Sequence, residues 1–209
     1  MAKYYENSTV FNYNYEQVLQ GFWKRYPNPY STHVLSEDTI QREIRDDGKL
    51  YSKRILTKTN RVPKWGERFF KAKFVCIVEE SLVDPKAKTL TTHTRNIGFN
   101  RIMSVTERVV YQADHHGKTI ANRSAWIDSQ VFGFATPIRA FGCERFKKNC
   151  QKSNLGFNYI LGILFPLQNP NSSLHQQDVT QKFKDVAKTA GEHMKEQIYQ
   201  ASHYNVSQN

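Results

Sequence analysis

The sequence lacks long hydrophobic runs and is poor in cysteine, with three among 209 residues. Its longest apolar stretch, 159–167, is broken by Gly162 and closed by Pro166, so it falls well short of the ~20 residues that span a membrane. Cys143 and Cys150 lie seven positions apart in an expected helix. At ~1.5 Å per residue, this places their Cα atoms beyond the ~7 Å that a disulfide allows. We therefore expect no membrane-spanning helix and free thiols.

Sequence signals for targeting and catalysis are also missing. Residues 1–6 have neither the apolar core of a secretion signal nor the Arg/Ser pattern of a transit peptide, so we expect no cleaved presequence. There is no Gly-x-Ser-x-Gly, no glycine-rich phosphate loop and no His-Glu-x-x-His. His115 and His116 sit in an expected turn, without further His or Cys at zinc-ligand spacing. We expect a protein that is not an enzyme and that holds neither a metal nor a cofactor.

What the chain has in excess is positive charge. There are 30 Lys and Arg against 19 Asp and Glu, a formal charge of +11. The segment after residue 170 carries four bases and four acids, so the whole excess lies in 1–170. Such a domain favours a polyanionic partner, either nucleic acid or an anionic lipid surface. Bases interleaved with aromatics fit single-stranded nucleic acid, but zinc-finger and ribonucleoprotein motifs are missing.

Hydrophobic periodicity predicts an α+β fold. Helical spacing covers 15–26 and returns at 134–164, where we expect a kink or boundary near 153–156, and a weak polar helix covers 174–201. Seven strands are expected at 4–13, 34–45, 50–59, 73–83, 88–97, 102–113 and 118–131. Short turns join most of them, which predicts an antiparallel meander. A long helix across a curled sheet leaves an internal apolar pocket wherever it does not fill the concave face.

Three constellations of basic residues are candidate binding sites. On the long helix, Arg145, Asn149 and Lys152 share a face and could bind an anion; a solvated basic face is the alternative. That stripe begins with Ile138 and Gly142 and ends with Gly156.

The second constellation is the proline-fixed segment from Arg25 to His33, for which an ordinary structural turn is the alternative. The third comprises Arg54, Lys58 and Arg61, which lead into an aromatic loop at 60–71. Bases beside Trp and Phe suit an anionic membrane interface. A strand edge protected by charge is the alternative explanation for this third group.

Four spaced motifs carry a family resemblance. Arg25-Tyr-Pro-Asn-Pro-Tyr-Ser-Thr-His33 closely resembles a signature near the N-terminus of the PRELI-like family of mitochondrial lipid-transfer proteins. Residues 54–65, 92–96 and 145–157 resemble the family's strand before the lid loop, a central strand and the C-terminal helix. The resemblance covers about residues 1–165.

The resemblance implies a lipid-transfer domain at 1–168, followed by a linker and polar tail at 169–209. Its fold would be a seven-stranded curved antiparallel sheet gripping a long C-terminal helix, with a lid loop, as in steroid-lipid and phosphatidylinositol transfer domains. Arg145 stands where some members have Lys, which keeps the charge but changes its geometry. Lipid-headgroup positions map to Arg25, His33, Arg54, Lys58, Arg145, Asn149 and Lys152. Lid and membrane-contact positions map to Arg61, Val62, Lys64, Trp65, Phe69 and Phe70.

The resemblance also implies a function. The ligand would be a phospholipid, expected to be phosphatidic acid, carried from the outer to the inner mitochondrial membrane for cardiolipin synthesis. Residues 30–33 look more like the phosphatidic acid branch than the sister branch that carries phosphatidylserine. The protein would work in the intermembrane space, peripheral on anionic membranes, with a small disulfide-stapled helical-hairpin chaperone and without nucleic acid. A phosphatidylserine carrier, a single-stranded nucleic-acid-binding module and a structural interaction protein remain alternatives.

Overall fold

We describe the chain from a computed structural model, which places residues 1–60, 64 and 72–166. Within them lie seven strands and two helices, and no end differs from its predicted position by more than three residues. The expected tail helix, the loop after residue 60 and the domain boundary at 168 lie outside the described residues, except for Lys64. The elements are β1 (Lys3–Phe11), α1 (Tyr15–Trp23), β2 (Val34–Ile44), β3 (Leu50–Thr59), β4 (Phe74–Asp84), β5 (Thr89–Ile97), β6 (Ser104–Ala113), β7 (Thr119–Asp128) and α2 (Ala135–Leu164).

The strands form one antiparallel sheet in the order β1-β7-β6-β5-β4-β3-β2. Strands β2 to β7 follow one another as the predicted meander, and β1 pairs with β7 at one end. A hairpin turn at 46–49 joins β2 to β3, and Gly48 there adopts a φ of 79°, which glycine tolerates without steric cost. Two register shifts interrupt the pairing of β2 with β3.

Helix α1 begins at a capping box. The Oδ1 atom of Asn14 accepts from the backbone N–H of Gln17 at 2.9 Å, and the Gln17 side chain accepts from the backbone N–H of Asn14 at 3.0 Å. The helix ends at Trp23, three residues earlier than predicted. Tyr26 precedes Pro27, and a residue before proline is disfavoured in the helical conformation. The early end leaves Arg25 outside the helix.

Helix α2 is continuous from Ala135 to Leu164, so the prediction of a kink or boundary near 153–156 is wrong. Gly156 is a contact point and not a break: a Cβ atom there would lie 2.7 Å from the Cγ atom of Asn28. The missing side chain lets α2 press directly on the turn that follows α1. Cys143 and Cys150 both lie in this helix, and the cysteines of the described residues are free, as the sequence predicted.

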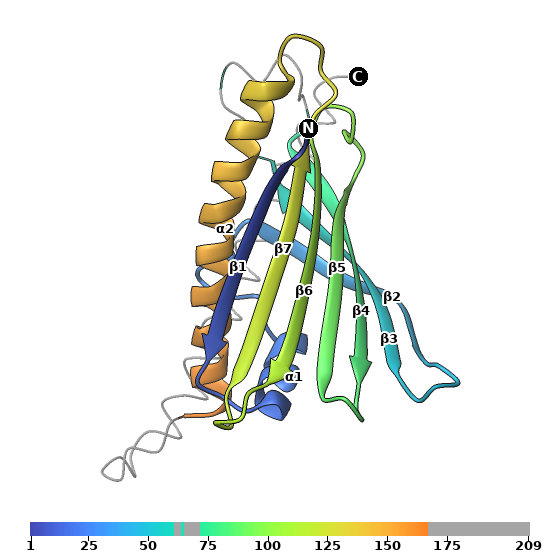
Figure 1. Cartoon of the computed structure of the whole chain (residues 1–209), viewed down its shortest axis with the longest axis vertical. Coiled ribbons are helices and arrows are strands. Elements are labelled where there is room, and N and C mark those ends of the chain that lie inside the picture. Colours follow the sequence, from blue (N-terminus) through green and yellow to red (C-terminus); the bar gives the residue numbers. More distant parts are fainter. Residues whose placement is uncertain (61–63, 65–71, 167–209) are drawn as a thin grey trace, which may run out of the picture.

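The position of α2 leaves part of the sheet uncovered by a helix. Figure 1 shows α2 beside β1 and β7, while β2, β3 and β4 fan out on the other side. The helix packs mainly on α1, β1 and β7. A core cluster that includes Phe11, Phe22, Phe157 and Leu161 fills the end of the molecule next to α1. No helix among residues 1–60 and 72–166 is both long and apolar enough to cross a bilayer.

Candidate functional site

A cavity of about 220 Å³ lies between α2 and the concave face of the sheet. Helix α2 packs on β1 and β7, and its side chains therefore do not cover the inward faces of β3 to β6 completely. The uncovered space is the cavity. Apolar side chains form much of its wall, including Leu56, Val75, Ile77, Val105, Val109 and Phe146. The pocket expected from the sequence is therefore present in the described part of the chain.

The structure brings five of the seven expected headgroup residues to this cavity. Lys152 is exposed and is not part of the wall, and Arg54 is buried behind it. Of the expected lid residues only Lys64 is described, and it is exposed; Arg61, Val62, Trp65, Phe69 and Phe70 lie outside the described residues. The five that line the cavity are Arg25, His33, Lys58, Arg145 and Asn149.

Arg25 and Arg54 share one buried carboxylate. The Nη2 atom of Arg25 lies 2.5 Å from Oε2 of Glu79. Arg54 donates from Nε to the other oxygen of Glu79 at 3.1 Å, and from Nη1 to Glu37 at 2.7 Å. These two arginines and two glutamates balance in charge. Arg25 and Arg54 are therefore already paired with acids of the protein itself.

Glu79 and Arg25 remain charged at neutral pH. Burial raises the pKa of Glu79, but Arg25 and Arg54 outweigh burial, so the pKa lies below its ordinary value of 4.5. Burial lowers the pKa of Arg25, but the negative charge of Glu79 and other nearby groups outweighs burial, so the pKa lies above its ordinary value. Aromatic rings of α1 add to the stabilisation: the Arg25 guanidinium lies 4.0 Å from the Phe22 ring centre, and that of Arg54 lies 4.9 Å from Trp23.

A row of inward-facing polar residues crosses the sheet below the cavity. In the strand register, Arg54 pairs with Glu79, Glu79 with Thr94, and Thr94 with Glu107. Thr94 donates its hydroxyl to Glu107 at 2.9 Å, and Glu107 lies 2.6 Å from Nε of Arg123 on β7. The cavity therefore rests on a polar floor made of charge pairs.

Arg123 is a buried cation of this floor that the sequence analysis missed. Its Nη1 atom is enclosed and makes no hydrogen bond to any residue of the described ranges. It also lies close enough to Cys150 on α2 to interact with that thiol. Burial nevertheless raises the pKa of Cys150 to about 11, so the group is a neutral thiol near pH 7 and not a nucleophile.

The basic stripe of α2 divides into contact points and cavity wall. Ile138, Gly142 and Gly156 are buried, and a Cβ atom on Gly142 would lie 2.7 Å from the Sδ atom of Met103. Between them, Arg145 and Asn149 are half-buried and face the cavity. Burial lowers the pKa of Arg145. The small residues thus set how closely α2 approaches the sheet, and the polar residues occupy the gap.

The cavity wall has an excess of positive charge. It contains five Lys and Arg side chains against two glutamates, Glu79 and Glu107. Both glutamates are already paired with arginines, and Lys58 forms no salt bridge with any residue placed by the structure. An anion in this cavity would meet net positive charge in an apolar enclosure, where attraction is stronger than in water.

The missed residues share one sequence signal. Along β7 the inward positions 119, 121, 123, 125 and 127 are all buried, and Arg123 is the only charged member. Glu79 interrupts an apolar strand in the same way. A charge at an inward strand position was the available clue, because such a charge requires a buried partner. No group of metal-ligating side chains occurs among the described residues.

The sequence matches a protein-family model and several curated mitochondrial proteins. A family model described as the PRELI-like family matches residues 16–165. PRELI domain-containing protein 1, mitochondrial, of Bos taurus is 48% identical over 169 residues, covering 78% of this chain and 77% of that protein. Protein UPS1, mitochondrial, of Saccharomyces cerevisiae is 33% identical over 173 residues, covering 81% of this chain and 99% of that protein.

A solved structure agrees in fold. The crystal structure of TTHA0849 from Thermus thermophilus matches 76% of this chain and 97% of its own, with a TM-score of 0.51 at 13% sequence identity. At that identity the likeness concerns the curved sheet and the long helix and not the ligand.

Proposed function

This chain belongs to the PRELI-like family, and from that premise we propose that it carries phosphatidic acid between mitochondrial membranes. The observation that carries the proposal is a cavity with apolar walls and an excess of positive charge. Each CH₂ group removed from water is worth ~0.8 kcal/mol, so acyl chains favour such walls. A phosphate favours the same cavity because it meets fixed cations there.

Lys58 and Arg145 are the phosphate-binding cations in this proposal. Lys58 of β3 and Arg145 of α2 both line the cavity, whereas the charges of Arg25 and Arg54 are balanced by Glu79 and Glu37. His33 and Asn149 supply further polar groups at its wall. A phosphomonoester carries up to about two negative charges. It therefore suits two converging bases better than a choline headgroup, which brings its own cation.

Loading requires the cavity to widen. Its volume of about 220 Å³ is below the ~300–1,000 Å³ of pockets that hold drug-sized ligands, and a two-chain lipid is larger still. We propose that α2 keeps its contacts with α1, β1 and β7 and moves away from the inward faces of β3 to β6. The acyl chains then extend towards the mouth, where the loop at 61–71 would cover them.

The wider setting follows from the family. The relatives above are named as mitochondrial proteins, and we propose the intermembrane space as the compartment, with transfer from the outer to the inner membrane for cardiolipin synthesis. The chain would act as a carrier without covalent chemistry. It would bind anionic membranes peripherally and pair with a small disulfide-stapled helical-hairpin chaperone.

A charge reversal inside the cavity tests the proposal. Arg145→Glu should lower the transfer of fluorescent phosphatidic acid between vesicles by about tenfold or more, because it replaces a phosphate partner by a repelling charge. Lys148→Glu is the matched control, since it introduces the same negative charge on the same helix at an exposed position outside the cavity wall. That variant should transfer at the wild-type rate, and both should keep the wild-type circular dichroism spectrum.

Two results would speak against the proposal. Equal loss in both variants would mean that surface charge, not the cavity, drives transfer. Phosphatidylserine measured in parallel should move more slowly than phosphatidic acid; faster movement of phosphatidylserine would make the chain a carrier of that lipid instead.

A further inference from the structure

Two loops at one end of the molecule expose aromatic side chains. One loop connects β5 to β6 and the other connects β7 to α2. A hydrogen bond joins them: the backbone N–H of Gln130 donates to the carbonyl of Arg101 at 2.8 Å. Phe132 is wholly exposed, with a relative exposure of 100%. Phe99 and Phe134 on the same loops are exposed by 39% and 38%, and Ile97 at the end of β5 is exposed by 46%. We call Ile97, Phe99, Arg101, Phe132 and Phe134 the rim.

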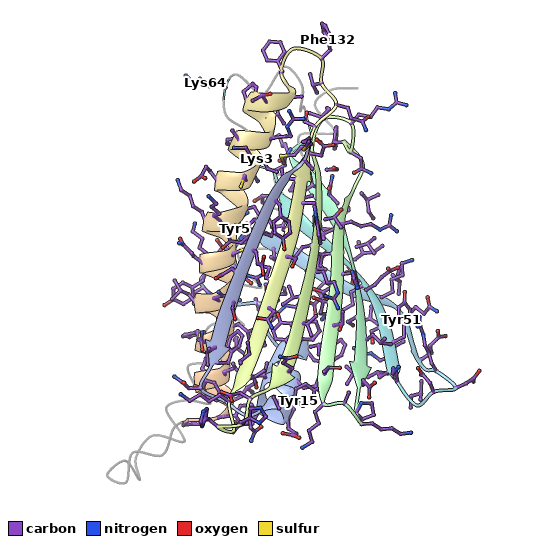
Figure 2. The ribbon with its side chains drawn as sticks, in the orientation of Figure 1. Lys3, Tyr5, Tyr15, Tyr51, Lys64 and Phe132 are labelled. Carbon is purple, nitrogen blue, oxygen red and sulfur yellow. The ribbon has the colours of Figure 1, made fainter. Side chains whose placement is uncertain are left out.

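The rim adjoins the wall of the cavity. Phe99 and Met103, from the loop between β5 and β6, form part of the cavity wall. The opposite end of the molecule, around Tyr15, is closed by the core cluster. Figure 2 shows Phe132 near the same end as Lys64, far from Tyr15. Because Phe99 is both exposed and part of the wall, a surface that contacts the rim also lies next to the cavity.

The backbone holds Phe99 in place at a cost. Phe99 has a φ of 52° between Gly98 at 75° and the turn that follows. The left-handed region costs a bulky residue of order 1–3 kcal/mol, and such strain gathers at binding sites. The backbone N–H groups of Ile102 and Met103 both donate to the Phe99 carbonyl at 2.9 Å, which fixes this conformation. The exposed ring is thus presented by a rigid turn.

The charge of the rim is of one sign. Segments 95–104 and 129–139 contain Arg95, Arg101 and Arg139 and no acidic residue. Arg139 pairs with Asp128 at 3.3 Å, while Arg95 and Arg101 are exposed. Exposed aromatics beside bases match the interface of an anionic bilayer, where rings lie at headgroup depth and bases meet lipid phosphates.

We propose that the rim docks this protein on anionic phospholipid bilayers, with Phe132 inserted among the headgroups and Arg101 on their phosphates. The inference deepens the proposed function, because it names the surface through which the cavity mouth meets a membrane. Docking holds the mouth against the bilayer, so a lipid passes between the two without its chains entering water.

The test measures vesicle association and not transfer. Phe132→Ser should weaken cosedimentation with phosphatidylcholine vesicles containing phosphatidylglycerol by about tenfold, the scale of one buried aromatic side chain. Phosphatidylglycerol supplies the negative charge without being the proposed cargo. Ile44→Ser is the matched control: Ile44 is 76% exposed but ends β2 at the hairpin far from the rim (Figure 1). It should associate as the wild type does.

Arg101→Gln separates the charge from the ring. It should weaken association with the anionic vesicles by about fivefold and leave the weaker association with pure phosphatidylcholine vesicles unchanged. All three positions are on the surface, so the unfolding midpoint of each variant should equal that of the wild type.

The outcomes separate docking from cargo. If Phe132→Ser associates with vesicles as the wild type does, or if Ile44→Ser loses as much association as Phe132→Ser, the rim is not the membrane-docking surface. The exposed aromatics of the rim would then be available to a protein partner instead. If the wild type binds these vesicles through Phe132 but takes up no phosphatidic acid, the proposed carrier function falls and the docking surface stands.

Discussion

At the scale of single residues, the polar floor of the cavity depends on charges that neutralise one another. Glu79 is the centre of this arrangement, because both Arg25 and Arg54 contact it while all three are buried. Removing one member of a buried ion pair leaves an uncompensated charge, which costs far more than the pair contributes. The floor is therefore a structural requirement of the cavity before any ligand enters.

Glu79→Gln should lower the free energy of unfolding by about 3–5 kcal/mol, measured by chemical denaturation. Glu80→Gln is the control on the same strand, since the Glu80 carboxylate is 35% exposed and lies 3.3 Å from the half-exposed Lys53. That change should cost less than about 1 kcal/mol. Similar costs for the two variants would mean that the buried cluster does not hold β3, β4 and the α1 exit together.

The same cluster predicts a pH dependence. The pKa of Glu79 in the folded chain lies below its ordinary value of 4.5, so its contribution to stability is complete above that pH. The contribution is lost as the pH falls below 4.5 and through the lowered pKa of the folded state. Denaturation at several acidic pH values should show a steeper loss of stability for the wild type than for Glu79→Gln.

These residues mark a limit of sequence interpretation. Arg25, Lys58 and Arg145 were predicted for the site and line the cavity, because they lie in recognisable motifs. Glu79 and Arg123 were missed, although their inward strand positions require buried partners. Their partners come from distant strands, and the sequence alone does not pair Arg25 with Glu79 or Arg123 with Glu107. Lys152 shares the helical face of Arg145 in sequence but is exposed in the fold.

At the scale of elements, α2 is positioned by two glycines on its inner face. Gly142 admits Met103, and Gly156 admits Asn28 of the turn after α1. The side chain of Asn28 is itself fixed, since it donates to the carbonyl of Arg25 at 2.7 Å and accepts from the N–H of Tyr30 at 3.0 Å. The periodicity of the sequence predicted this helix well, whereas it suggested a kink where the structure has a contact.

Gly156→Ala should destabilise the protein by about 1–3 kcal/mol, because the added Cβ overlaps the side chain of Asn28 and pushes α2 away from the turn. Gly162→Ala lies in the same helix, where the added Cβ would meet only the Tyr13 hydroxyl at 3.6 Å. That control should be neutral or stabilise by about 0.5–1 kcal/mol. Thermal or chemical denaturation compares the two; a tolerated Gly156→Ala would contradict the close contact.

At the scale of the whole molecule, the cavity results from where one helix lies on one sheet. The seven strands and the long helix followed from the sequence, as did the expectation of a hollow beneath the helix. The sequence did not predict that α2 lies over β1 and β7, because contacts between distant segments set that position. That offset gives β3 to β6 an open concave face and places Lys58 and Arg145 on facing walls.

The most direct measurement is native mass spectrometry of the protein purified from cells. A hollow chain with two facing cations should retain one phospholipid per molecule, enriched in phosphatidic acid over choline lipids. Arg145→Glu should lose that adduct, and Lys148→Glu should keep it. A wild-type chain that carries no lipid, or that carries oligonucleotide in its place, would contradict the central claim.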